Sequence, residues 1–218
     1  FSFKKIIARI SNGFGNQLFI YAASYAFSKS LKYDLLLDVK SGMKKLRKFN
    51  TRDHKYSHYL PKFELSVFNI SAPLAPDKLC FDNKMGYFKR KVLSFIDPFV
   101  QQKKFIIEKK DSKKKTRFDN SLLNNSFNKV LYVEGYYESE KYFANYKSDL
   151  LKEFSFKNPV SCNKSYLNLI NNSNSVSIAF RRNRYSEPFS DNKNLSKIKK
   201  SNDFDIEQSK YVYNAIDY

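Results

Sequence analysis

The chain has 218 residues, of which 42% are hydrophobic and 28% charged, with only 5 Gly and 6 Pro. This composition is ordinary for a folded globular protein and excludes a low-complexity chain. No apolar run approaches the ~20 residues that a membrane-spanning helix needs, and no secretory signal peptide is visible.

The charge balance is strongly basic, with 40 Lys and Arg against 21 Asp and Glu and a net charge of +19. Such a charge favours a nucleotide, a nucleic acid or an anionic membrane as partner. The chain is also crowded with Asn, Phe, Tyr and Ile, which share A/T-rich codons with Lys, so we attribute most lysines to compositional drift. A weak attraction to anionic lipid or nucleotide remains. No nucleic-acid-binding module is recognisable, so nucleic acid is not an expected partner.

The cysteines and histidines predict neither a disulfide nor a metal site. Cys80 and Cys162 are far apart and lack CxxC spacing, which is typical of reduced thiols in a cytoplasmic protein. His54 and His58 have the i, i+4 spacing of a helical zinc pair, but no Glu lies between them and no third ligand is evident.

The first forty residues read as a strand–helix–strand unit. Residues 4–10 (KKIIARI) predict a buried strand, and a Gly-containing turn follows at residues 11–15. Apolar residues at helical spacing predict a helix over residues 16–31, and residues 34–39 predict a second buried strand. This order is typical of an α/β fold with a parallel sheet.

The middle of the chain is harder to interpret. Residues 40–129 alternate Lys-rich stretches with short apolar runs and suggest an irregular, helical or loop-rich insertion. Residues 130–133 predict another strand, and residues 139–154 predict one amphipathic helix. Residues 164–171 predict a short helix.

The last forty residues read as the beginning of another unit. Residues 176–180 predict a buried strand with Arg181 and Arg182 at its carboxyl end, where open parallel sheets bind ligands. A final helix is predicted from about residue 205 to residue 218. It runs to the end of the sequence without a stop signal, so we expect the sequence to be cut short at its C-terminal side.

Two motifs point to binding of a phosphorylated ligand. Gly13 and Gly15 form a turn between strand and helix that brings the backbone close to a ligand. As a dinucleotide fingerprint the turn is poor, because Leu18 occupies the third glycine position, although Asp38 partly fits the expected acid. A plain strand-to-helix turn is equally compatible with the residues.

The second motif is the arginine pair Arg181 and Arg182, which can bind a diphosphate and offset charge on a phosphate leaving group. Glu187 is a candidate carboxylate base nearby. Asp203 and Asp205 have the spacing of a metal-binding Asp-x-Asp pair, but helix capping is the favoured interpretation.

Three segments together resemble glycosyltransferase family 11, the bacterial α-1,2-fucosyltransferases. Residues 7–22 (IARISNGFGNQLFIYA) are similar to the family's opening, with Asn12 in place of a glycine and Phe14 in place of Leu or Met. Residues 131–143 look like its Gly-Tyr-x-Gln segment. Residues 179–185 (AFRRNRY) resemble its His-x-Arg-Arg-Gly-Asp-Tyr motif, but the histidine, glycine and aspartate positions hold Ala, Asn and Arg.

The resemblance implies a GT-B-like α/β fold with two Rossmann-like domains around a cleft, the second incomplete here. The expected domains are residues 1–173, with the irregular insertion at about 40–129, and residues 174–218, the start of a donor-binding domain. The implied reaction is inverting and metal-free: L-fucose passes from GDP-fucose to a galactoside hydroxyl with α-1,2 linkage, in lipopolysaccharide or capsule synthesis. No cofactor is expected.

The resemblance also assigns roles to residues. Arg181 and Arg182 would contact the diphosphate, and Glu187 would act as the base. The substrate-binding residues would be Gly13, Gly15, Asn16, Gln17 and Tyr185. The expected partners are GDP-fucose, a galactose-containing glycan acceptor and, by peripheral contact, an anionic membrane, which places the protein in the cytoplasm at the inner membrane.

Two alternatives stay open. The changed third motif allows a non-catalytic relative that binds glycan or an anionic surface. The Gly13–Gly15 turn allows an NAD-dependent Rossmann oxidoreductase.

Overall fold

The computed structural model describes residues 4–43, 62–108, 117–158, 164–176, 206–207 and 209–214. The chain divides into two compact units, Phe1–Val160 and Ser161–Tyr218, and each is described by itself. The domain limits expected from the sequence, at residues 173 and 174, remain a prediction. The predicted strand at residues 176–180 lies outside the described residues except for Val176.

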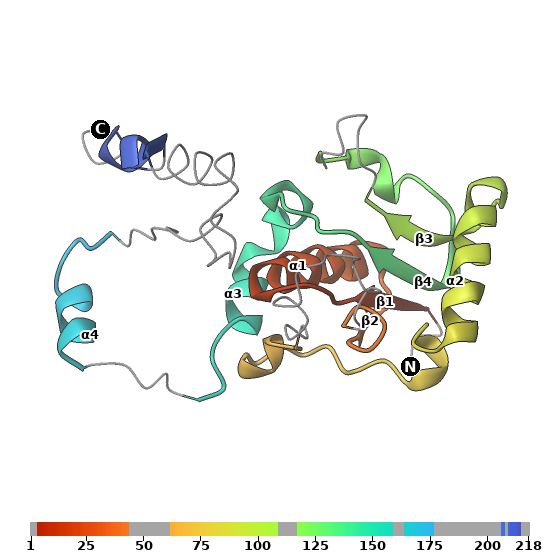
Figure 1. Cartoon of the computed structure of the whole chain (residues 1–218), viewed down its shortest axis with the longest axis horizontal. Coiled ribbons are helices and arrows are strands. Elements are labelled where there is room, and N and C mark those ends of the chain that lie inside the picture. Colours follow the sequence, from red (N-terminus) through yellow and green to blue (C-terminus); the bar gives the residue numbers. More distant parts are fainter. Residues whose placement is uncertain are drawn as a thin grey trace, which may run out of the picture. The chain divides into compact units, whose positions relative to one another are not determined.

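The first unit is built on a parallel sheet (Figure 1). Its strands are β1 (Lys5–Arg9), β2 (Asp34–Asp38), β3 (Lys103–Ile107) and β4 (Phe127–Glu134), in the order β2-β1-β4-β3. Ile6 of β1 pairs with Leu35 of β2 on one side and with Leu131 of β4 on the other. All the pairings are parallel, so the predicted α/β fold is confirmed.

One face of the sheet is covered by α1 (Phe14–Leu31). Ten of its 18 residues are buried, because it lies between the sheet and the aromatic segment that follows β4. Phe27 meets the rings of Tyr137 and Tyr142 edge-on. The predicted helix is therefore confirmed, and it begins two residues earlier than residue 16.

The opposite face carries a smaller apolar cluster of Ile7, Ala75 and Cys80. It is covered by the chain from residue 71 to residue 82 and by α2 (Lys84–Ile96). The described part of residues 40–129 thus contributes an edge strand of the sheet, β3, and the 13-residue helix α2. A five-residue strand with two lysines has little local signal, and it becomes a strand because β4 pairs with it.

The single helix predicted over residues 139–154 is wrong. Two short 3-10 turns, Glu140–Tyr142 and Ala144–Tyr146, precede α3 (Lys147–Glu153). The break at Phe143 lets two neighbouring rings both reach the core: Phe143 contacts Phe19, while Tyr142 contacts Phe27. Core packing therefore overrides the helical pattern.

The second unit contains α4 (Lys164–Asn171), with the bounds that the sequence predicted. Residues 206–207 and 209–214 are helical, within the predicted final helix. Among the described residues, no helix has the length and apolarity needed to cross a membrane.

Candidate functional site

The order of the strands singles out one place on the sheet. From β1 the chain passes through α1 to β2 on one side, and it later returns to β4 on the other side of β1. The loops after β1 and β4 therefore both begin at the carboxyl edge of the sheet, at the ends of neighbouring strands. In open parallel sheets ligands bind outside the carboxyl ends of the strands. Residues 10–17 of the first motif and residues 134–137 of the middle motif begin there.

The loop after β1 depends on an unusual backbone conformation at Asn12. Its φ of 64° lies in the left-handed region, which Gly and then Asn adopt most easily. This explains why Asn12 can occupy a position at which glycosyltransferase family 11, which the sequence resembles, has a glycine. The turn then delivers the chain to Gly13, which is the N-cap of α1.

The start of α1 is open to solvent. Gly15 is exposed, and a Cβ atom added to it would meet nothing within 4 Å. Among the residues that the structure describes, no side chain caps this helix end, which leaves its first N–H groups to solvent or a ligand. The predicted binding residues Gly13, Gly15 and Asn16 therefore lie at the carboxyl edge and are at least partly accessible.

Gln17 is placed differently, inside the protein. Its side chain is fully buried, and its amide nitrogen donates to the carbonyl oxygens of Asn12 and Lys62 at 2.8 and 2.7 Å. Its amide oxygen accepts from the N–H of Glu64 at 3.0 Å. Gln17 thus joins the loop after β1 to the segment that begins at residue 62.

The loop after β4 is equally constrained. A Cβ on Gly135 would lie 2.5 Å from the Cβ of Glu108, so no larger residue fits. Tyr137 has a φ of 52° and is fully buried, and its hydroxyl lies 3.0 Å from the carbonyl oxygen of Ile106. Burial holds the pKa of Tyr137 well above its ordinary value. Backbone strain that is held this firmly is common at functional sites.

Charged side chains end three neighbouring strands on the face that α2 covers. They are Arg9 on β1, Asp38 on β2 and Glu134 on β4, and both carboxylates are buried. Arg90 of α2 forms a bidentate ion pair with Glu134. Burial lowers the pKa of Arg9, while the charge of Glu134 opposes this effect. The sequence analysis did not identify this cluster, although a charge directly after each apolar strand was a visible signal.

Three carboxylates at the ends of the strands already have partners. Asp38 accepts from the Ser41 hydroxyl at 2.6 Å and from the N–H groups of Lys40 and Ser41. Glu134 is held by Arg90, and Glu108 accepts from the N–H groups of Tyr136 and Tyr137 at 2.8 and 3.0 Å. These groups therefore fix the loops and are poorly placed to remove a proton from a substrate.

Gly42 ties the loop after β2 to the same edge. A Cβ on Gly42 would lie 1.9 Å from the carbonyl oxygen of Ile10, so the two loops are in direct backbone contact. Arg9 reinforces the contact by donating to the hydroxyl and the carbonyl oxygen of Ser41 at 3.1 and 3.0 Å. The carboxyl edge is therefore a rigid platform under the exposed first turn of α1.

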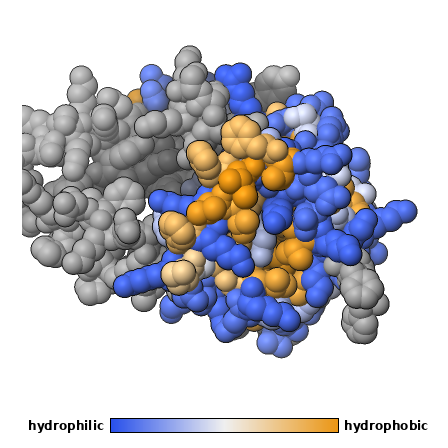
Figure 2. Space-filling view, turned by 90° about the vertical axis from the view of Figure 1, so that its right-hand side faces the viewer, coloured by the Kyte–Doolittle hydropathy of each residue, from blue (hydrophilic) through white to orange (hydrophobic). Residues whose placement is uncertain are grey.

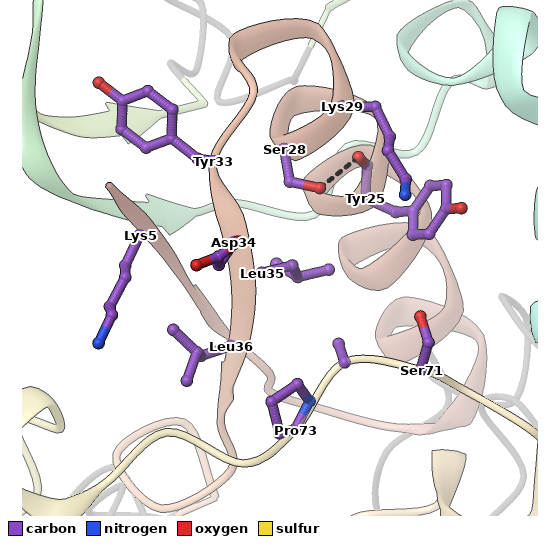
Figure 3. Close-up of a pocket in the computed structure, with 11 residues that line it drawn as sticks. Lys5, Tyr25, Ser28, Lys29, Tyr33, Asp34, Leu35, Leu36, Ser71 and Pro73 are labelled. Atoms are coloured by element: carbon purple, nitrogen blue, oxygen red, sulfur yellow. Dashed lines mark hydrogen bonds between the residues drawn. The ribbon is translucent and has the colours of Figure 1, made fainter. Parts of the chain in front are cut away.

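A hollow of about 510 Å³ lies away from the carboxyl edge, at the amino end of β1 and β2 (Figure 3). Lys5, Tyr25, Lys29 and Ser71 are among its lining residues, and the Lys29 ammonium lies 4.9 Å from the centre of the Tyr25 ring. The amino ends of the strands do not carry the loops that contain the two motifs. We therefore place the candidate site at the carboxyl edge.

The remaining predicted site residues, Arg181, Arg182, Tyr185 and Glu187, lie outside the described residues. His54, His58, Cys162 and the pair Asp203 and Asp205 do too. Within the part of the chain that the structure describes, no group of three or more His, Cys, Asp or Glu side chains could hold a metal ion.

Comparison with known proteins relates the chain to glycosyltransferases. It is 27% identical over 187 residues to an alpha-1,2-colitosyltransferase of Escherichia coli, a match that covers 83% of this chain and 55% of that protein. The chain thus spans about half the length of the curated relative it matches. No family model matches the chain, and no solved structure matches it.

Proposed function

We propose that this chain belongs to an inverting glycosyltransferase that transfers L-fucose from GDP-fucose to a galactoside hydroxyl with α-1,2 linkage. The observation that carries the proposal is that two motif segments, residues 10–17 and residues 134–137, follow neighbouring parallel strands and begin at the same carboxyl edge of the sheet. The similarity to an alpha-1,2-colitosyltransferase supports the same class of reaction.

In the proposed reaction, the acceptor oxygen attacks the anomeric carbon of the donor sugar. The new C–O bond forms as the bond between that carbon and the diphosphate oxygen breaks, and GDP leaves. The acceptor proton passes to a carboxylate base. Attack from the opposite side inverts the β-linked donor to an α-linked product.

We assign the proposed binding roles to residues in each of the two units. The first unit would bind the acceptor at the exposed first turn of α1, where backbone N–H groups and the Asn16 side chain can meet sugar hydroxyls. Arg181 and Arg182 would neutralise the charge that develops on the leaving diphosphate.

The base is proposed to come from outside the carboxyl edge. Asp38, Glu108 and Glu134 are each held by partners of their own loops or helices. Glu187, which follows the arginine pair, therefore remains the proposed base.

The test uses the complete native protein with GDP-fucose and a set of galactosides, without added metal. GDP release and product mass are followed for the unaltered protein, Arg181→Ala and Arg184→Ala. We expect Arg181→Ala to lower kcat/KM by roughly a hundredfold or more, since it removes a donor to the developing charge. Arg184→Ala is the matched control, because it removes the same charge three residues away, and it should have a much smaller effect.

Binding measurements separate the alternatives. Calorimetry should detect GDP, and the protein should be stabilised against heat by GDP but not by NAD. Absence of GDP binding would overturn the proposal. GDP binding without turnover on any acceptor would favour a non-catalytic relative, and stabilisation by NAD alone would favour the oxidoreductase alternative.

A second donor is suggested by the name of the relative, which is a colitosyltransferase. Direct competition between GDP-fucose and a nucleotide-activated colitose on one acceptor would rank the two donors. Preference for the colitosyl donor would correct the sugar while leaving the proposed class of reaction intact.

A further inference from the structure

The helix α2 exposes an unusual amount of apolar surface. Figure 2 faces the side of the molecule that carries α2 and shows a hydrophobic band bordered by hydrophilic residues. Exposed apolar side chains of α2 form what we name the α2 stripe: Met85, Phe88, Val92, Phe95 and Ile96. Phe95 is 75% exposed, and none of the helix's residues is buried.

The stripe follows the helical repeat. Met85, Phe88, Val92 and Phe95 are spaced by three or four residues, so their side chains lie along one side of α2. The opposite side holds the helix to the protein through the ion pair of Arg90 with Glu134. In a surface helix of a globular protein the apolar side ordinarily faces the core, so this outward stripe requires a partner.

Lysines border the stripe on both sides. On a helical projection, Lys84 and Lys91 flank one border and Lys89 flanks the other, and all three are exposed. The helix contains no Asp or Glu between Lys84 and Ile96. An apolar stripe with a lysine rim is the pattern of a helix that lies in the interface of an anionic membrane.

We propose that α2 docks this protein on an anionic phospholipid surface, with the α2 stripe in the acyl boundary and the three lysines at the headgroups. Charge complementarity favours this occupant over a second copy of the chain, which would bring its own lysines and a net charge of +19 to the contact. Docking of this kind needs no membrane-spanning helix.

These 218 residues contain no Trp, so Trp variants within them can be tested in the complete native protein, with the emission of the unaltered protein as the baseline. Phe95→Trp places a single indole in the stripe, and Leu151→Trp places one on α3 at a site that is 66% exposed. With vesicles of mixed phosphatidylcholine and phosphatidylglycerol, we expect a blue shift of the Trp emission for Phe95→Trp only. Neither variant should shift with pure phosphatidylcholine.

The contribution of charge is tested with two triple variants of equal charge loss. Lys84→Ala, Lys89→Ala and Lys91→Ala remove the rim, whereas Lys147→Ala, Lys152→Ala and Lys157→Ala remove exposed lysines on and beside α3. Vesicle affinity should fall roughly a hundredfold for the rim variant, about fivefold per lysine, and should change little for the control. High salt should weaken binding of the unaltered protein.

Several results would overturn the proposal. They are absence of vesicle binding, equal binding to neutral vesicles, and equal losses in the two lysine variants, which would indicate attraction by bulk charge. A blue shift of Phe95→Trp without vesicles that grows with protein concentration would identify a second copy as the occupant instead.

Discussion

The two faces of the sheet use their helices in opposite ways. The 18-residue α1 buries ten residues against β1, β2 and the aromatic segment after β4. The 13-residue α2 has no fully buried residue, and all of its large apolar side chains except Leu93 are exposed. Apolar content alone therefore does not decide which helix forms the core.

The contacts of each helix explain the difference. In α1, the side chains of Tyr21, Tyr25 and Phe27 each contact an aromatic ring from the segment after β4. The buried Gln17 side chain accepts a hydrogen bond from the backbone N–H of Glu64. The helix α2 is tied to β4 by the ion pair of Arg90 with Glu134, and the Asn83 side chain caps its first turn by accepting from the N–H of Gly86 at 2.6 Å. Helix α1 thus contributes to the hydrophobic core, while α2 leaves an apolar surface exposed to solvent.

The largest expected effect comes from truncating the same residue type in the two helices. Ile20 of α1 is 0% exposed, and Ile96 of α2 is 41% exposed. Ile20→Ala should lower the free energy of unfolding by about 2–5 kcal/mol, because it leaves a cavity. Ile96→Ala should change it by about 0.5 kcal/mol or less. Denaturant unfolding measures both, and equal losses would show that α2 belongs to the core after all.

The buried ion pair should rank next. Glu134→Ala leaves Arg90 without its partner beside Arg9, and the free energy of unfolding should fall by about 3 kcal/mol. Adding Arg90→Ala to this variant should cost less than the sum of the single changes, since the two groups are coupled. Asp77→Ala, which breaks the exposed contact with Lys40, is the control and should have little effect. Strict additivity would contradict a coupled pair.

Within the site, the neighbouring residues Asn16 and Gln17 should have different roles: Gln17 should stabilise the fold, and Asn16 should bind the acceptor. Gln17→Ala removes a buried amide with three backbone partners and should cost about 1–3 kcal/mol of stability. Asn16→Ala should leave the thermal midpoint nearly unchanged and, under the proposed function, should raise KM for the acceptor. Thermal melts and acceptor titrations of the two variants provide the comparison. A reversed pattern would place Gln17, not Asn16, against the substrate.

The smallest effect concerns Cys80, on the α2 face. Burial, with a smaller contribution from the charge of Asp38, raises the pKa of its thiol to about 12. The thiol is thus protonated in both the folded and the unfolded states at neutral pH, and it contributes no pH dependence there. Above roughly pH 9 the unfolded thiol ionises while the folded one does not, so stability falls as pH rises. Unfolding midpoints should fall further between neutral and alkaline pH for the unaltered protein than for Cys80→Ala, which keeps the loss caused by buried tyrosines such as Tyr137.

Much of the fold could be predicted from local pattern. The strand–helix–strand unit of β1, α1 and β2, the strand β4 and the helix α4 all follow from apolar runs and helical spacing. The Gly13–Gly15 turn identified one half of the candidate site, because glycines between a buried strand and a helix are a local signal. The partner half, the tight loop at Gly135, was visible as a motif, but the pairing of β4 with β1, which brings both loops to one edge of the sheet, was not.

The sequence by itself determined which segments of the first unit form the parallel sheet's centre, because apolar periodicity is a property of neighbouring residues. Only the tertiary structure decided that β3 joins the sheet beside β4, that Tyr142 and Phe143 interrupt a helix, and that Gln17 is buried. It also decided that α2 turns its apolar stripe outward, because Arg90 on its other side pairs with Glu134. These outcomes depend on partners distant in the chain, and their free energies appear only when those partners meet.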